Sequence, residues 1–305
     1  MKWLVVALMA LAGAGTLAAS DVVAVRPEFT AVVDSTARLE VIATGDLKFT
    51  EGPVWVPEGG FLLFSDIQGD RICRWQPGVE GYTVWRQPSG QSNGLLLDKN
   101  GRVICCEHTG RRVSLLFGPD SAITLCDSYQ GKRFSSPNDV ALHPNGSIWF
   151  TDPPYGLVNK KPDLPANYVF RLDAGETEPV VVADDFQRPN GIVFSPNKKI
   201  LYVDDTQKGH VRRFGVEGGR VKDLGVFAQV SSGGPDGMCV DRLGRLYVSC
   251  REGVVVFSPD GTLEGRIPTP QQATNCCFGG EDWKTLFITT PPTVYSIKLR
   301  VAGLP

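Results

Sequence analysis

Residues 188–205 read RPNGIVFSPNKKILYVDD, and this stretch contains the unit that decides the fold. A polar residue and a glycine precede an apolar run, a turn follows, and a second apolar run ends in acidic residues. Five other segments repeat this unit, and each begins with one polar lead residue; the six are Glu51, Asn93, Asn138, Asn190, Asp236 and Asn275. They lie 39 to 52 residues apart, and a third apolar run follows in most units. A period near 45 residues with about four short strands per unit is typical of a β-propeller.

We therefore predict an all-β chain that forms one six-bladed β-propeller over residues 35–300. Apolar runs between Gly- and Asn-rich turns indicate strands, and no stretch shows a convincing helical period. The longest interval, between Asn138 and Asn190, predicts an insertion around residues 159–167 that lies over one face. Residues 38–43 are predicted to supply an outer strand that closes the ring with the last blade. A sandwich or jelly roll is the alternative, but neither requires six matched units.

The first 20 residues predict a secretory signal peptide. Lys2 precedes a short apolar run, and Ala18-Ala19-Ser20 is a small-residue cleavage site. We expect residues 21–34 to form a lead segment and the protein to be exported, periplasmic or secreted, with no membrane association after cleavage. An uncleaved anchor is the alternative. The charges balance, with 31 Lys and Arg against 33 Asp and Glu, which argues against nucleic-acid binding. The pattern does not predict an oligomeric state.

Eight cysteines in an exported chain raise the question of disulfides. Most of them lie in apolar, strand-like runs, where a free thiol acts as a small hydrophobe. The adjacent pairs Cys105-Cys106 and Cys276-Cys277 would point to opposite faces of a strand, so neither pair can form a single site. We predict mostly buried thiols, with one or more disulfides as the alternative.

The six lead residues predict a metal site at one mouth of the central channel. The first strand of each propeller blade lies against the channel, so equivalent positions form a ring there. This ring contains the carboxylates Glu51 and Asp236 and four Asn side chains. Such an all-oxygen set suits hard divalent cations such as Ca²⁺ and Mg²⁺. The alternative is that each Asn-Gly pair is only a turn.

A second ring follows from the same geometry, because the second strand of each blade runs back to the same mouth. Its end positions are predicted to line a cavity around the metal; they are Asp66, His108, Asp152, Asp204 or Asp205, Cys250 and Thr289. Residues 90–94, GQSNG, match the nucleophile elbow of serine hydrolases. That motif needs a following helix, whereas here a strand, a turn and a second strand follow.

Several segments in order resemble the gluconolactonase branch of the regucalcin (senescence-marker protein) and gluconolactonase family. They include EGPVW at 51–55, SPNDVALHPNGSIWFTDPPYG at 136–156, RPNGIVFSPN at 188–197 and GGPDGMCVDRLGRLYV at 233–248. The resemblance implies a six-bladed propeller that hydrolyses lactones with one divalent cation, with Ca²⁺ preferred and Mg²⁺, Zn²⁺ or Mn²⁺ as alternatives. It implies that the metal ligands are Glu51, Asn138, Asn190 and Asp236. It also matches Asn93 to a pocket residue, and His108 lies in the Glu-His step that is typical of this branch.

The expected function is that of a metal-dependent lactonase that opens a small-molecule sugar lactone of the aldono- or gluconolactone type. The cation would act as a Lewis acid on the carbonyl, and water would attack. Asp236 or His108 would be the general base. Substrate hydroxyls would contact Asn93, His108, Asp152 and Tyr155. The alternatives are a non-catalytic, exported metal-binding scaffold, a lactonase, esterase or phosphotriesterase with a non-sugar substrate, and a strictosidine-synthase-like propeller, which would not be expected to keep the four ligands.

Overall fold

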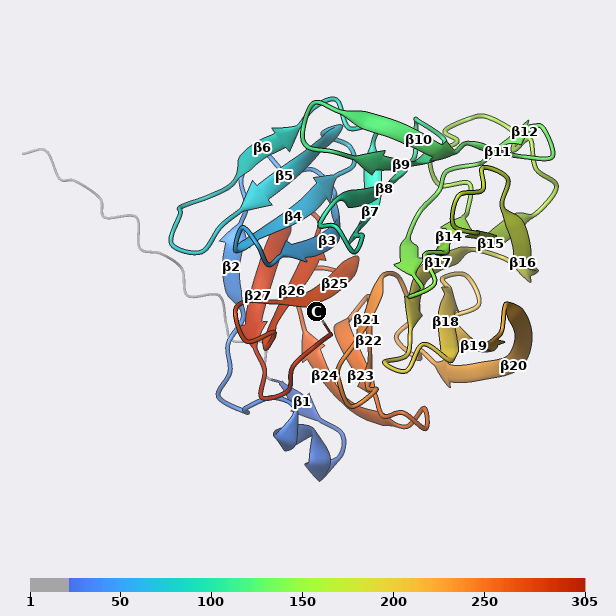
Figure 1. Ribbon diagram of the computed structural model, residues 1–305. Coiled ribbons are helices and arrows are strands. Elements are labelled where there is room, and N and C mark those ends of the chain that lie inside the picture. Colours follow the sequence, from blue (N-terminus) through green and yellow to red (C-terminus); the bar gives the residue numbers. More distant parts are fainter. Residues whose placement is uncertain (1–21, 305) are drawn as a thin grey trace, which may run out of the picture.

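The computed structural model describes residues 22–304 and contains six antiparallel sheets arranged as blades around a central axis (Figure 1). The predicted six-bladed β-propeller is therefore confirmed. The predicted signal peptide lies outside the described residues. Within residues 22–304, no helix has the length and apolar character needed to cross a membrane.

The blades follow one another along the chain, with the inner strand first in each. Blade 1 comprises β3 (Thr50–Val56), β4 (Phe61–Asp66), β5 (Arg71–Trp75) and β6 (Thr83–Arg86). Blade 2 comprises β7 (Ser92–Leu97), β8 (Val103–Glu107), β9 (Arg112–Leu116) and β10 (Ala122–Cys126). A hairpin of β11 (Ser128–Tyr129) and β12 (Lys132–Arg133) precedes blade 3, which comprises β13 (Val140–Leu142), β14 (Ile148–Asp152), β15 (Asn167–Leu172) and β16 (Val180–Phe186).

The second half of the chain repeats this order. Blade 4 comprises β17 (Pro189–Phe194), β18 (Ile200–Asp205), β19 (His210–Glu217) and β20 (Arg220–Gln229). Blade 5 comprises β21 (Met238–Val240), β22 (Leu246–Cys250), β23 (Gly253–Phe257) and β24 (Leu263–Pro268). Blade 6 comprises β25 (Asn275–Gly279), β26 (Thr285–Thr290), β27 (Thr293–Lys298) and, from the other end of the chain, β2 (Glu40–Ala43).

The ring closes through β2, which pairs antiparallel with β27, with Val41 opposite Tyr295. This confirms the closing strand predicted for residues 38–43. The segment before it docks on blade 5: β1 (Val23–Ala24) pairs with β24, and a short 3-10 helix, η1 (Pro27–Ala31), follows. Phe29 of that helix is buried against Gly265, where a Cβ atom would lie 2.2 Å from the aromatic ring.

Apolar side chains fill the spaces between adjacent blades. Trp55 of blade 1 stacks on Phe287 of blade 6 with ring centroids 5.5 Å apart, and Tyr247 of blade 5 meets Phe278 of blade 6 edge to face at 5.0 Å. All eight cysteines are free thiols and six of them are buried, as predicted. The core is thus a set of wedges between sheets, because each sheet must cover both of its faces.

Glycines beside the lead residues allow the inner strands to approach one another. A Cβ atom on Gly52 would lie 1.9 Å from the Asn93 carbonyl oxygen, and one on Gly191 would lie 2.3 Å from the Asp236 carbonyl oxygen. Gly94 N donates to the Asn138 carbonyl at 2.8 Å. Gly94 and Gly191 lie within strands β7 and β17. These Asn-Gly pairs are therefore not turns, since the glycines provide the space in which neighbouring blades meet.

The predicted insertion lies in the loop between β14 and β15, residues 153–166, which contains no strand. Asp163 of this loop forms an ion pair with Arg111 of blade 2 at 2.8 Å. At the other end, Gly156 N donates to Ser136 Oγ at 2.8 Å. A Cβ atom on Gly156 would lie 2.9 Å from His108 Cβ. The loop therefore covers part of the mouth at which the lead residues lie.

Candidate metal and substrate site

The structure brings Glu51, Asn190 and Asp236 together from blades 1, 4 and 5. The Asp236 carboxylate interacts with the side chains of both Glu51 and Asn190. Glu51 Oε2 accepts hydrogen bonds from Gly52 N at 2.7 Å and from Asn275 Nδ2 at 2.9 Å. Two lead residues at the ends of the series, Glu51 and Asn275, are thus in direct contact across the closure of the ring.

Asn138, the fourth predicted ligand, is buried on blade 3 next to an acidic residue that the sequence prediction missed. Asp139 accepts from Val140 N at 2.9 Å and from Ile192 N at 3.4 Å. It follows a lead residue at a place where four of the other blades have glycine. This aspartate in place of glycine is the feature of the sequence that could have predicted a further acidic residue at the site.

Asp204 and Asp205 were alternatives for one position of the second ring, and the structure distinguishes them. Asp205 accepts backbone hydrogen bonds from Gln187 and Arg188 at 2.7 and 3.1 Å. Asp204 is fully buried, and neither of its carboxylate oxygens has a hydrogen-bond partner among the described residues. An ionised carboxylate left in this state is costly unless a cation or a proton neutralises it.

Four carboxylates therefore act on one another at the inner end of this mouth: Glu51, Asp139, Asp204 and Asp236. Burial raises the pKa of Asp236 well above its usual value, and the Glu51 and Asp139 charges raise it further. Burial also raises the pKa of Asp204, with Asp236 and Asp139 as further causes. Burial raises the pKa of Asp139 to about 7, with Glu51 as the next cause. Within the described chain, no lysine or arginine is among the groups that shift these pKa values.

This environment fits a hard cation. Unpartnered carboxylate oxygens and amide oxygens are the ligands that Ca²⁺ and Mg²⁺ prefer. No three His, Cys, Asp or Glu side chains among residues 22–304 form a metal-binding group on their own. The predicted ligand set is of a different kind, since it combines two carboxylates with two amides.

The end-of-strand acids mostly have a structural role, and the predicted substrate contact of Asp152 is wrong. Asp152 is 0% exposed, and its two oxygens accept from Ser135 N and Ser136 N, both at 2.8 Å. Asp66 and Asp205 accept from the same two backbone positions of their own blades, three and two residues before the lead residue. These carboxylates hold the chain that leads into each inner strand, so they cannot contact substrate hydroxyls.

His108 and Asn93 form a buried pair beside the insertion loop. His108 Nε2 lies 3.1 Å from Asn93 Nδ2, an arrangement in which an unprotonated Nε2 accepts from the amide. Burial lowers the pKa of His108 to about 4, so the ring is neutral at neutral pH. Asn93 Oδ1 is buried and has no hydrogen-bond partner among the described residues. The amide oxygen is therefore available to a ligand hydroxyl.

Tyr155 lies at the same mouth and is 39% exposed. Burial of part of its ring raises the pKa of its hydroxyl to about 12, and the Asp236 and Asp204 charges add to this rise. The tyrosine is thus within electrostatic range of the carboxylate cluster while its ring faces solvent. Asp152 and Tyr155 were both predicted to contact substrate. Tyr155 is accessible from solvent, whereas Asp152 is not.

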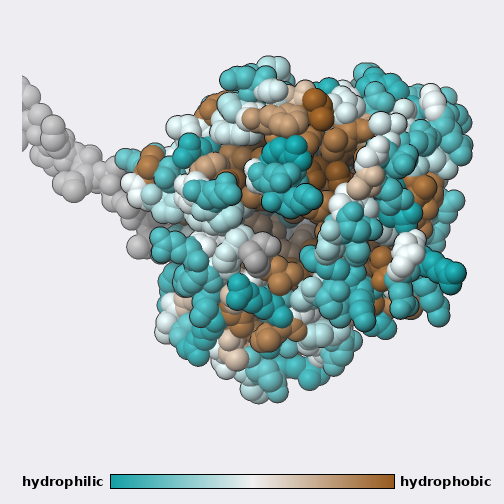
Figure 2. Space-filling model, in the orientation of Figure 1, coloured by the Kyte–Doolittle hydropathy of each residue, from teal (hydrophilic) through white to brown (hydrophobic). Residues whose placement is uncertain are grey.

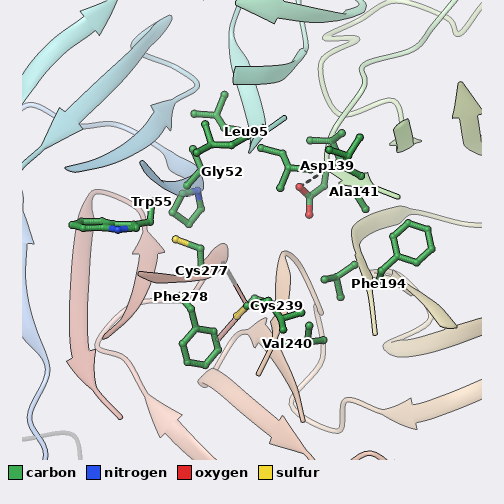
Figure 3. A pocket seen from close by; sticks show the side chains of 18 of the residues that line it. Gly52, Trp55, Leu95, Asp139, Ala141, Phe194, Cys239, Val240, Cys277 and Phe278 are labelled. Carbon is green, nitrogen blue, oxygen red and sulfur yellow. Dashed lines mark hydrogen bonds between the residues drawn. The ribbon is translucent and has the colours of Figure 1, made fainter. Parts of the chain in front are cut away.

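A separate cavity of about 560 Å³ occupies the channel on the other side of the lead ring. Apolar inner-strand residues such as Leu95, Ala141 and Val240 line it, and Asp139 reaches it from the ring (Figure 3). Hydrophobic residues gather near the centre of the face seen in Figure 2. None of the four predicted substrate-binding residues lines this cavity, so it is distinct from the mouth that holds His108 and Tyr155.

Comparison with known proteins shows the family and agrees with the fold. The family model described as SMP-30/gluconolactonase/LRE-like region matches residues 49–291, and the chain belongs to this family. It is 32% identical over 91% of its length to a gluconolactonase of Zymomonas mobilis, of which it covers 85%. It is 29% identical over 86% of its length to a pentonolactonase of Haloferax volcanii, of which it covers 84%.

A solved structure is similar over nearly the whole chain. It is a gluconolactonase of Xanthomonas campestris, with a TM-score of 0.86 and 35% sequence identity, and the match covers 92% of this chain and 96% of the other. The likeness in fold therefore extends over all six blades.

Proposed function

We propose that this protein is a metal-dependent lactonase that opens the ring of a sugar lactone. The observation that carries the proposal is the carboxylate cluster of the fully buried Asp204 and the half-buried Asp236, beside the neutral His108–Asn93 pair. The names of the relatives, gluconolactonase and pentonolactonase, support the reaction and the sugar-lactone class.

Glu51, Asn138, Asn190 and Asp236 would hold the divalent cation, with Ca²⁺ preferred over Mg²⁺, Zn²⁺ and Mn²⁺. When bound, the ion supplies a Lewis acid that polarises the lactone carbonyl. The protein contributes the frame, because Thr206 Oγ1 accepts from Asn190 Nδ2 at 3.0 Å and donates to the Pro235 carbonyl at 2.8 Å. This link fixes the start of β17, which carries Asn190, relative to the loop that carries Asp236.

His108 is the proposed general base. Asp236 belongs to the ligand set, and a carboxylate bound to a cation has low proton affinity. His108 is neutral, so its Nε2 would take the proton of the attacking water after exchanging the hydrogen bond from Asn93 Nδ2 for one from that water. Asn93 Oδ1 would accept from a substrate hydroxyl, and Tyr155 would contact the exposed edge of the sugar ring.

The test is hydrolysis of glucono-1,5-lactone by the purified chain with Ca²⁺ and after treatment with a chelator. We expect turnover that is lost with the chelator and restored by added cation. Asp236→Asn should lose both turnover and the increase in thermal stability that Ca²⁺ produces. His108→Gln should lose turnover and keep that increase, because it removes the base and leaves the ligands.

Turnover that is equal with and without chelator would rule out metal dependence. Ca²⁺ binding without hydrolysis of any sugar lactone would favour the exported, non-catalytic scaffold. Hydrolysis of aryl esters or phosphotriesters in preference to sugar lactones would favour a non-sugar substrate.

We also propose that the chain is exported after cleavage near Ser20, on the basis of its N-terminal residues. Expression of the full chain followed by cell fractionation and N-terminal sequencing tests this. A protein that retains Met1 in the cytoplasmic fraction would contradict it.

A further inference from the structure

We infer that the lactone carries a carboxylate remote from the carbonyl that reacts, and that Arg188 and Arg251 bind it. This inference rests on the proposed function and names the substrate class of the same site.

Arg188 lies two residues before Asn190, on the loop that enters β17. Its backbone N–H is anchored on Asp205 Oδ1 at 3.1 Å. Its guanidinium lies over the ring of Tyr155, 5.4 Å from the centroid. No carboxylate in residues 22–304 forms an ion pair with it, so its charge is held beside an exposed aromatic ring and is free to bind an anion.

Arg251 lies on blade 5, directly after β22. Its backbone N–H donates to the Gly233 carbonyl. A Cβ atom on Gly234 would lie 3.8 Å from Arg251 Cγ, so the side chain runs along the loop that leads into Asp236. Arg251 is exposed, and like Arg188 it has no ion-pair partner in the described part of the chain.

Two arginines beside the same mouth, in blades 1 and 2, differ from Arg188 and Arg251 because they form ion pairs with carboxylates of the protein. Arg71 pairs with Asp66 and Asp46, and Arg111 pairs with Asp163. Arg188 and Arg251, by contrast, have no ion-pair partner among residues 22–304, and they lie on the loops around Asn190 and Asp236 of blades 4 and 5. A substrate whose carbonyl lies over the lead ring would place its far end toward this side.

A guanidinium binds a carboxylate through charge-assisted hydrogen bonds, and such bonds are stronger than those to a neutral hydroxyl. In an aldonolactone the far end is a hydroxymethyl group, whereas in an aldarolactone it is a carboxylate. The reaction is otherwise unchanged. Water adds across the acyl C–O bond, the ring oxygen becomes a hydroxyl, and the open-chain dicarboxylate is released with one proton and without any redox change.

The experiment compares two lactones that differ only at C6, D-glucono-1,4-lactone and D-glucaro-1,4-lactone, with the Ca²⁺-loaded protein. We expect kcat/KM to favour the glucarolactone by about tenfold, through KM, as one strong charged contact would give. Raising the ionic strength from about 0.05 to about 0.5 M should lower this preference, because salt screens the attraction.

Arg188→Gln and Arg251→Gln should each reduce the ratio of the two kcat/KM values several-fold, and Arg188→Lys should restore part of it. Arg220→Gln, at the exposed first residue of β20, is the matched control and should leave the ratio unchanged. A ratio at or below one in the native protein, or a ratio unaffected by both glutamine variants, overturns the inference while gluconolactone turnover continues. If the loaded protein hydrolyses neither lactone, nor glucono-1,5-lactone, the lactonase proposal itself fails.

Discussion

At the scale of single residues, neighbours of the same type have opposite environments in this protein. Asp205 satisfies backbone N–H groups, whereas Asp204, one residue earlier, is buried with unpartnered oxygens. Successive side chains of a strand point to opposite sides, so a shift of one position converts a structural carboxylate into a site carboxylate. The choice between such neighbours depends on the register of β18 and cannot be read from their chemistry.

The structural role of Asp152 leads to a prediction about stability. Asp152→Asn replaces one acceptor oxygen with a donor that faces a backbone N–H, so we expect a loss of about 1–3 kcal/mol in the free energy of unfolding. Urea denaturation measures the loss, and KM for the lactone should stay near the native value. A raised KM with unchanged stability would restore the substrate-binding role.

His108 leads to a prediction about pH. Its pKa in the folded chain, about 4, lies below the usual histidine value of 6.5, so the unfolded chain takes up a proton first as the pH falls. The folded state therefore loses stability between pH 6.5 and 4. His108→Gln should lose less stability than the native protein over this range, which urea denaturation at pH 7, 5.5 and 4.5 would measure. A difference between the two proteins that is constant with pH would contradict the assignment.

At the scale of elements, each inner strand packs the core, and its lead residue lies within the strand or, for Asn138 and Asp236, two residues before it. The spacing of the repeats predicted where these strands begin, because one turn type and one apolar run recur in each unit. Neighbouring inner strands lie so close together that there is no space for a Cβ atom on the glycines after Glu51, Asn93, Asn190 and Asp236. In blade 3 the corresponding residue is Asp139, which adds a negative charge to the ring. The repeat pattern does not predict this carboxylate, because the other blades have no acidic residue at that position.

The closing strand β2 gives a prediction with an internal control. Ala43 is 2% exposed and packs in the core between blades 1 and 6, whereas Val41 on the same strand is 45% exposed. Ala43→Asp buries a charge without a partner and should cost more than about 2 kcal/mol. Val41→Asp should stay within about 0.5 kcal/mol of the native value. Chemical denaturation compares them, and equal effects would mean that β2 does not hold the ring closed.

At the scale of the whole molecule, the proposed cation would join four blades that are distant in sequence. Its ligands come from blades 1, 3, 4 and 5, so binding should stabilise the folded ring as a unit. A ligand present at about 100 times its Kd adds about 2.7 kcal/mol to the free energy of unfolding. We expect Ca²⁺ to raise Tm and a chelator to lower it, as measured by calorimetry. Glu51→Gln should reduce the increase in Tm that Ca²⁺ produces. A Tm of the native protein that does not change with millimolar Ca²⁺ would argue against the site.

The sequence by itself determined the number of blades, the closing strand and the six lead residues, because these depend on local patterns that recur at a regular interval. Only the tertiary structure decided which acidic residues belong to the site. Asp152 binds backbone N–H groups of its own blade, whereas Asp139 and Asp204 join Glu51 and Asp236. The physical reason is that a carboxylate's role depends on the donors and charges around it, and these come from blades that meet only when the ring closes.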